Sequence, residues 1–248
     1  MNNYNLQFIS NIDLYNHVYE TVNAYSFEMD LKKFNKNLID PIKLTFDSIV
    51  YDQSYNDTIE NEVLRQLDKT NSNLIGYFHQ NIFKYFSNDW IVPKQGYDIE
   101  NQKEKILVEM KNKHNTMNSS SSAKTYMKMQ GKIIEDNETK CYLVEIIAKN
   151  SQNIPWVVTI DGEKQKPIEN IRRVSIDKFY EIVTNDKLAF QKLCTTLPVV
   201  IKDVVNDIKT RSKKNTVFAE LDNLSPDLLT SIYLLSFKKY EGFNNFKL

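Results

Sequence analysis

The sequence predicts an α/β fold, in which a central mixed β-sheet is flanked by helices and a helical region forms the N-terminus. Apolar residues recur at helical spacing through much of residues 11–86, whereas short runs rich in β-branched and aromatic residues follow from residue 90. Helical spacing returns after residue 175. The chain has 248 residues, 41% of them hydrophobic, which suffices to bury the core of such a fold.

One domain is expected over residues 1–248, because the chain contains no internal repeat and no long linker. Within it we expect a helical N-terminal region at 1–70, a core at 71–215 and a C-terminal helix at 216–248.

The first part of the chain is expected to be helical. Helices are predicted within residues 11–50, and another begins near Asp57 or Thr58, either of which can cap it. The stretch 71–73 contains two asparagines and indicates a break and a restart. The helix that follows has a wide apolar face made of Leu74, Ile75, Phe78, Ile82, Phe83 and Phe86.

Strands are expected in the middle of the chain, at 90–93, 97–99, 105–111, 141–147 and 156–160. Further helices are expected at 123–134, 175–183, 187–206 and 225–240. Asp161 and Gly162 predict a turn, and Pro198 would kink or interrupt its helix. Trp90 and Trp156 lie beside apolar strand residues and are expected in the core.

Composition excludes several classes of protein. Apolar runs such as Leu197–Ile201 are far shorter than a membrane span, and Met1–Tyr4 lacks a signal-peptide profile, so we expect a cytoplasmic protein with no membrane partner. The cysteines, Cys141 and Cys194, have no metal-site spacing. The five glycines form no GxGxxG or GxxxxGK motif, which argues against a nucleotide cofactor.

The net charge is zero, but charge is distributed unevenly along the chain. Residues 1–100 contain 8 Lys and Arg against 14 Asp and Glu, whereas residues 101–248 contain 24 against 18. The segment Lys103–Lys132 holds seven lysines and two glutamates. Such a surface can bind an anion, although ordinary solvated helix faces have the same composition.

One spacing points to catalytic chemistry: Asp98 is followed eleven residues later by Glu109 and then by Lys111. If the two strands that hold them pair as an antiparallel hairpin with its turn centred at 103–104, Asp98 lies opposite Glu109. Lys111 lies on the same face of its strand as Glu109, because side chains alternate along a strand.

Two carboxylates about 5 Å apart repel each other unless a cation lies between them. Mg²⁺ suits this arrangement, since it is commonly held by one or two carboxylates together with a phosphate, and the carbonyl of Met110 is a candidate third ligand. Lys111 would orient or deprotonate a water beside the metal, or stabilise charge that develops on the phosphate. The same three residues also suit a solvent-exposed strand face.

Longer motifs around these residues resemble a known family. Gly96–Asp98 and the run VEMKNKHNTMNSSS at 108–121 are similar to the active-site stretch of type II restriction endonucleases of the PD-(D/E)xK superfamily, and within it to enzymes that cut GGNCC-type sites. The resemblance extends from about residue 74 to 243. Tyr97 stands where the superfamily often has proline, which leaves the carboxylate in place.

The resemblance implies a restriction-endonuclease-like core and a bacterial, Mg²⁺-dependent homodimer. Such an enzyme hydrolyses one phosphodiester in each strand of double-stranded DNA and leaves a 5′-phosphate. The resemblance also implies that Asp98 and Glu109 are metal ligands and that Lys111 is the catalytic lysine. Many members also use an acidic or amide side chain on the helix before the first strand. Gln80 is the nearest candidate for this role, and His79 and Glu62 are the next candidates.

Contacts to DNA are assigned to three groups of residues. A ridge at i, i+4 and i+8 on the helix over 123–134 suits phosphates: Lys124, Lys128 and Lys132. Base edges are assigned to Arg172 and Arg173 and to the loop before that helix, with the candidates Lys113, His114, Asn115, Asn118, Ser119 and Ser120. The alternatives are a surface pair for Arg172 and Arg173 and a structural role for His114, as expected for His17.

Two other functions are also compatible with the sequence. A nuclease of repair, resolution or transposition would use the same residues. A non-catalytic DNA-binding or partner-binding protein would keep the carboxylates only in salt bridges.

Overall fold

The computed structural model describes residues 3–87, 89–208, 214–240, 243 and 246–247. Its contacts divide the chain into two compact units: unit 1 comprises residues 1–23 and 75–208, and unit 2 comprises residues 24–74 and 209–248. These boundaries differ from the segments expected from the sequence. The single domain over 1–248 stays a prediction.

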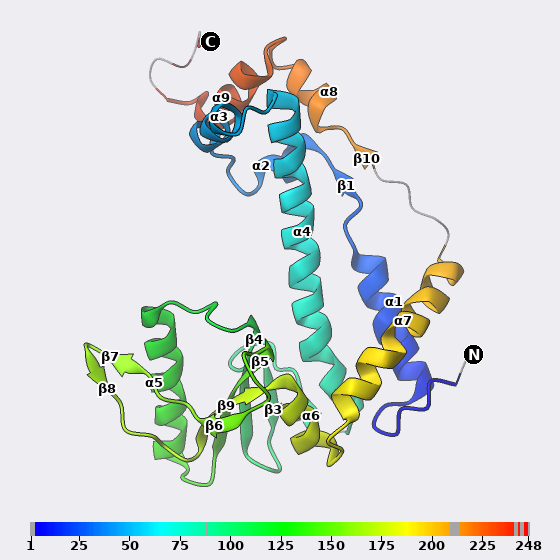
Figure 1. Cartoon of the computed structure of the whole chain (residues 1–248), viewed down its shortest axis with the longest axis vertical. Helices are drawn as coiled ribbons and strands as arrows, with labels where there is room; N and C mark the ends of the chain where they lie inside the picture. Colours follow the sequence, from blue (N-terminus) through cyan, green and yellow to red (C-terminus); the bar gives the residue numbers. More distant parts are fainter. Residues whose placement is uncertain (1–2, 88, 209–213, 241–242, 244–245, 248) are drawn as a thin grey trace. The chain divides into compact units, whose positions relative to one another are not determined.

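Unit 1 is built around a six-stranded sheet with the order β2-β3-β4-β5-β9-β6 (Figure 1). The strands are β2 (Trp90–Ile91), β3 (Ile99–Asn101), β4 (Ile106–Lys113), β5 (Lys140–Ile147), β6 (Asn153–Pro155) and β9 (Ile171–Ser175). The three central strands β4, β5 and β9 are parallel, and the other three pair antiparallel. The predicted α/β class with a mixed sheet is therefore confirmed.

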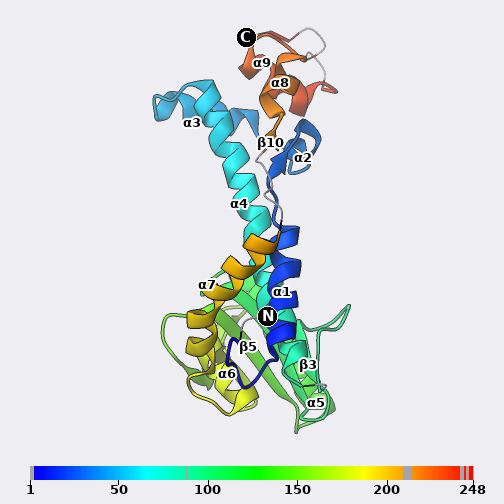
Figure 2. The ribbon, with the colours of Figure 1, turned by 90° about the vertical axis from the view of Figure 1, so that its right-hand side faces the viewer.

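Helices cover both faces of this sheet. They are α1 (Asn11–Ala24), α5 (Ser119–Glu135), α6 (Ile176–Thr184) and α7 (Ala189–Asp207). The core on the α5 face contains Tyr126 and Met129 packed on Cys141 and Leu143, whereas the α6 face buries a larger cluster around Phe179. α1 and α7 lie side by side (Figure 2), and the Tyr15 hydroxyl of α1 donates to Asp207 of α7 at 2.6 Å.

The β3–β4 hairpin has the predicted register, with Ile99 paired to Val108. Asp98 lies one residue outside this ladder, and its N–H donates to the Val108 carbonyl at 2.9 Å. Along β4 the apolar face is buried and Glu109 and Lys111 are half-buried on the other face, as their alternation predicted. The register of this hairpin therefore places Glu109 and Lys111 on the same face of β4.

Unit 2 is mostly helical and contains short strands. Its elements are β1 (Glu28–Met29), α2 (Leu31–Asn35), α3 (Pro41–Val50), most of α4 (Tyr55–Asn81), β10 (Lys214–Asn215), α8 (Val217–Asp222) and α9 (Leu228–Phe237). Phe34 and Val63 pack in one core with Leu221 and Ile232, so both chain segments contribute to it.

The helices differ from the sequence predictions in several places. α4 has no break at 71–73, because Asn71 directs its side chain to the Ser26 N–H (3.0 Å) instead of competing for its own backbone. In the C-terminal region α9 confirms the helix predicted at 225–240, and α8 is an additional helix that was not predicted. α7 runs on through Pro198 without an interruption, and the apolar helix expected up to Phe86 ends as a 3₁₀ turn over Ile82–Tyr85.

The strands at the far edge of the sheet also differ from the prediction. Residues 156–160 are not one strand: β6 ends at Pro155, and β7 (Thr159–Ile160) pairs with β8 (Glu163–Lys164). The predicted turn at 161–162 joins β7 and β8, and Asp161 and Gly162 both have positive φ, as such tight hairpins require. β9 was not predicted at all. In the described part of the chain, no helix is long and apolar enough to cross a membrane.

Candidate active site

The charged residues of β4 lie beside charged residues of the two neighbouring strands, on the sheet face that α5 covers. Parallel pairing places Lys111 of β4 next to Glu145 of β5, and Glu109 next to Leu143. Leu143 in turn pairs with Arg173 of β9. Because register-paired residues share a face, one row of charged side chains forms near the carboxyl end of these strands.

Asp98 reaches this row from the start of β3. Its Oδ2 accepts the Met110 N–H at 2.7 Å, which fixes the carboxylate against the edge of β4. Burial raises the pKa of Asp98, and the neighbouring Glu109 carboxylate raises it further, while the Met110 N–H and the Lys111 ammonium lower it. Asp98 is therefore a mostly buried carboxylate that lies close enough to Glu109 and Lys111 for both charges to act on it.

Lys111 is held by Glu109. Its Nζ donates to Glu109 Oε1 at 2.7 Å, and both side chains are partly buried. This pair keeps the amine beside the two acids, as the spacing predicted.

The donor set suits a hard divalent cation. Asp98 and Glu109 would be its two carboxylate ligands; among the described residues no three His, Cys, Asp or Glu side chains form a metal cluster. Mg²⁺ tolerates so few protein ligands, because waters and phosphate oxygens complete its shell. A cation here would also relieve the repulsion that raises the pKa of Asp98. The residues present therefore fit such an ion.

Glu145 is a site residue that the sequence interpretation missed. Its side chain is 2% exposed, its Oε1 accepts from Arg173 Nη2, and its Oε2 lies 3.0 Å from His114 Nδ1. Burial alone would raise the pKa of Glu145, but hydrogen bonds from Arg173 and His114 outweigh it and hold the pKa below its usual value. The sequence feature that could have indicated Glu145 is that it is the single carboxylate in the otherwise apolar strand predicted over Cys141–Ile147.

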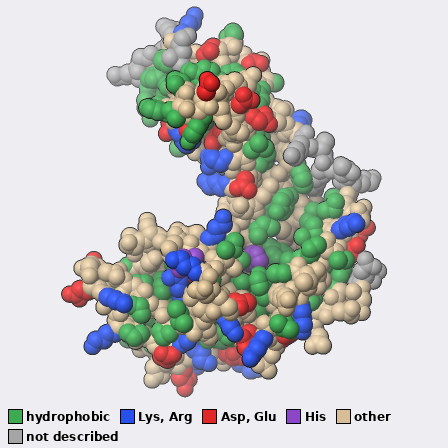
Figure 3. Space-filling view, viewed as in Figure 1, with side chains coloured by type: hydrophobic (Ala, Val, Ile, Leu, Met, Phe, Trp, Pro, Cys, Tyr) green, Lys and Arg blue, Asp and Glu red, His purple; other side chains and the backbone are tan. Residues whose placement is uncertain are grey.

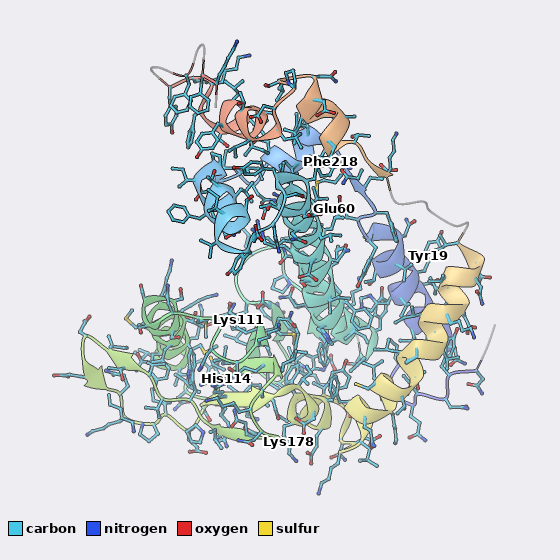
Figure 4. The ribbon with its side chains drawn as sticks, turned by 45° about the horizontal axis from the view of Figure 1, so that its top comes forward. Tyr19, Glu60, Lys111, His114, Lys178 and Phe218 are labelled. Atoms are coloured by element: carbon cyan, nitrogen blue, oxygen red, sulfur yellow. The ribbon has the colours of Figure 1, made fainter. Side chains whose placement is uncertain are left out.

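His114 and Arg173, both assigned to DNA from the sequence, thus meet at one carboxylate. Arg173 Nη2 lies 2.8 Å from His114 Nδ1. Figure 4 shows Lys111 and His114 in the same part of unit 1, and in Figure 3 basic and histidine side chains gather together on the visible face of this unit. Arg172 is adjacent to Arg173 on β9 and so faces the opposite side, where it binds Glu169 and Asn153.

The loop and helix after β4 carry the other DNA candidates. Asn118 caps α5, since its Oδ1 accepts the Ser121 N–H at 2.8 Å. The remaining loop and first-turn candidates are exposed: Lys113, Asn115, Ser119 and Ser120. Asn115 adopts a positive φ of 56°, which asparagine tolerates well.

The three lysines of the α5 ridge are all exposed but differ in their contacts. Lys128 donates to the Gly96 carbonyl at 2.6 Å and lies 3.8 Å from the centre of the Tyr97 ring. Lys132 pairs with Glu135. In the part of the chain that the structure describes, Lys124 has no ion pair, so of the three it is the most available to a phosphate.

The candidates on α4 are not joined to the row of charges by any hydrogen bond among the described residues. Gln80 is half-buried. Burial, with a smaller effect of His17, lowers the pKa of His79 to about 4. Glu62 lies in unit 2 and binds Arg65 and Gln66. His17 is buried and bonded to the Phe78 carbonyl, in line with a structural role.

A mixed sheet with two carboxylates and a lysine on one face is typical of nucleases that hydrolyse phosphodiesters with the help of a metal ion. Comparison with known proteins identifies the particular family. The model of the Eco47II restriction endonuclease family matches residues 6–206, which include every candidate site residue.

Two relatives cover most of the chain. It is 32% identical over 235 residues to the type II restriction enzyme Sau96I of Staphylococcus aureus, with 89% of each chain covered. It is 28% identical over 217 residues to the type II restriction enzyme Eco47II of Escherichia coli, with 82% of this chain and 89% of that one covered. The chain belongs to the Eco47II restriction endonuclease family.

The predicted function is thereby confirmed: the protein is a type II, sequence-specific deoxyribonuclease. Its substrate is DNA, and its family depends in general on a divalent metal.

Proposed function

We propose that the enzyme is a Mg²⁺-dependent homodimer that cuts both strands of double-stranded DNA at a GGNCC-type site in the bacterial cytoplasm and leaves 5′-phosphates. The sheet of unit 1 with its flanking helices would be its restriction-endonuclease-like core. The observation that carries the proposal is the placement of Asp98, Glu109 and Lys111 together on one sheet face, where Asp98 is bonded to the Met110 N–H between the other two residues and Glu109 holds the Lys111 amine.

Each of these residues has a separate task. Asp98 and Glu109, with the Met110 carbonyl, would hold Mg²⁺. The ion would supply positive charge next to the phosphate and an activated water. The Lys111 ammonium, held by Glu109, donates N–H groups toward a phosphate oxygen and stabilises the negative charge that grows there. Gln80 stays a predicted further contributor.

DNA contacts would surround this centre. Lys124, with Lys128 and Lys132, would position the DNA backbone, and the exposed loop residues at 113–120 would reach base edges. Arg173 and His114 belong to the same surface through Glu145. The role of Arg172 as a base-reading residue stays a prediction.

A homodimer follows from the number of cuts. Each chain supplies one such set of residues, whereas cleavage of duplex DNA requires two hydrolyses. A symmetric dimer provides two sites related by the same two-fold axis as a palindromic DNA site.

Plasmid cleavage tests the proposal. Wild type should give a fixed set of fragments with Mg²⁺ and none in EDTA. Glu109→Gln and Lys111→Ala should lose at least about 10²-fold in cleavage rate while staying folded. Glu163→Gln, the same chemical change at an exposed position of β8, should cut normally. Normal cutting by Glu109→Gln or Lys111→Ala would contradict the proposed site, and a smear instead of discrete bands would contradict site-specific cleavage by this centre.

A further inference from the structure

A small polar cavity lies beside Lys111 at the carboxyl end of the central strands. Its volume is about 50 Å³, and its polar lining comes from Lys111, Asn115, Thr116, Ser122, Glu145 and Arg173. Two of these residues carry positive charge, Glu145 carries a negative charge that Arg173 pairs with, and three are neutral hydrogen-bonding groups. The cavity has room for more than one water-sized group.

Glu145 is not available to a metal ion. Both of its oxygens are engaged, one by Arg173 and the other by His114, and the carboxylate is almost fully buried. It therefore differs from Asp98 and Glu109. Its charge balances that of Arg173 and fixes where the guanidinium lies.

Arg173 keeps unused donors in this arrangement. A guanidinium has five N–H groups, and here Nη2 donates to Glu145 and lies 2.8 Å from His114 Nδ1. Nε is buried and has no hydrogen-bond partner among the described residues. An unpartnered buried donor is unfavourable, so an acceptor that reached it would be bound more tightly.

We propose that Glu145 is a positioning residue, which holds the Arg173 guanidinium next to Lys111 so that both cations receive one phosphate of the DNA backbone at this cavity. Arginine suits phosphate because its planar N–H groups match two phosphate oxygens. An arginine that is free before binding loses side-chain entropy when it binds, and the ion pair with Glu145 orders the Arg173 guanidinium before DNA arrives. This inference rests on the proposed endonuclease function.

The test compares Glu145→Gln, Arg173→Gln and the double variant with wild type and with the control Glu163→Gln. The double variant removes both charges together, so it leaves no unpaired buried charge that would prevent folding. Thermal unfolding establishes that each variant is folded. Cleavage is measured in single turnovers with Mg²⁺, and binding of a duplex that contains a GGNCC site is measured in EDTA at several salt concentrations.

Glu145→Gln should cut at least 10-fold more slowly although it carries one negative charge fewer. Arg173→Gln should cut equally slowly, and the slope of log affinity against log salt should become shallower by about 0.9, the value for one lost phosphate contact. The double variant should be no slower than Arg173→Gln, because the two residues act as one unit.

Three results would overturn the inference. The first is a folded Glu145→Gln that cleaves at the wild-type rate, and the second is a Glu145→Gln that binds DNA more tightly with an unchanged cleavage rate. The third is a double variant whose loss of cleavage rate equals the product of the losses of the two single variants. A purely structural pair would lower the unfolding temperature without changing the salt slope. Failure of the wild type to cut with Mg²⁺ would instead contradict the proposed function. The salt slope in EDTA would still report whether Arg173 contacts a phosphate.

Discussion

Asp98 is a mostly buried carboxylate, and its ionisation is expected to oppose folding at neutral pH. Its pKa is raised mainly by burial and also by Glu109, so the folded state binds the Asp98 proton more tightly than the unfolded state does. This favourable contribution is fully present below the usual carboxyl pKa and is lost as the pH rises through the raised pKa. Above that window the charged side chain lowers the free energy of unfolding.

Asp98→Asn should therefore abolish cleavage and raise the unfolding temperature at pH 7. An amide oxygen can still accept the Met110 N–H, so the local structure should persist. Thermal unfolding followed from pH 7 downward should show the stability gap closing through the window between the usual and the raised pKa. A variant less stable than wild type at pH 7 would show that the carboxylate supports the fold.

His79 is expected to change the stability with pH in the opposite direction to Asp98. Its pKa falls to about 4 because burial favours the neutral ring, so its contribution to stability is present above about pH 6.5 and is lost as the pH falls toward 4. Between pH 7 and pH 4.5 the free energy of unfolding should therefore decrease by roughly 2 kcal/mol less in His79→Asn than in wild type. Urea unfolding at pH 7 and pH 4.5 measures it, with the exposed Lys113→Ala as a control that should leave the pH dependence unchanged.

The row of charges shows how far single residues can be predicted. Asp98, Glu109 and Lys111 were predicted because one local hairpin brings them together. Glu145 was not, because its partners lie on β9 and in the loop after β4, and only the sheet order makes them neighbours. Arg172 and Arg173 look equivalent in sequence, yet the strand directs them to opposite faces.

Among the elements, α5 depends on its first residues. Asn118 Oδ1 accepts the Ser121 N–H and satisfies one of the free donors at the start of the helix. Asn118→Ala should lower the free energy of unfolding by about 1 kcal/mol, which corresponds to roughly 2–4 °C in a chain of this size. Ser120→Ala, in the same exposed turn, is the matched control. Equal effects of the two substitutions would exclude capping as the cause.

Elements with strong local signals were predicted well, and the others were not. The β3–β4 register follows from a tight turn, and α5 follows from a cap and an apolar stripe. β9 was not predicted because two adjacent arginines suggest a surface loop, whereas in the structure Arg173 pairs with the buried Glu145 of the neighbouring strand. Asn71 indicated a break in α4 because its bond to Ser26, far away in sequence, could not be foreseen.

At the scale of the whole molecule, the homodimer makes a direct prediction. Sedimentation at micromolar concentration should give twice the 29.2 kDa mass of one chain. Dilution that dissociates the dimer should slow double-strand cleavage more than in proportion to enzyme concentration. A particle that stays at the mass of one chain and still linearises plasmid without a nicked intermediate would contradict this prediction.

The division into two units also sets an order of events during synthesis. All residues of unit 1, including Asp98, Glu109, Lys111, Glu145 and Arg173, have been translated by residue 208. The core of unit 2 still lacks Leu221 and Ile232 at that point, so Phe34 and Val63 lack part of the apolar surroundings that bury them. Because domains tend to fold as they emerge from the ribosome, the sheet that carries the nuclease centre can form before the C-terminal segment of unit 2 has been translated.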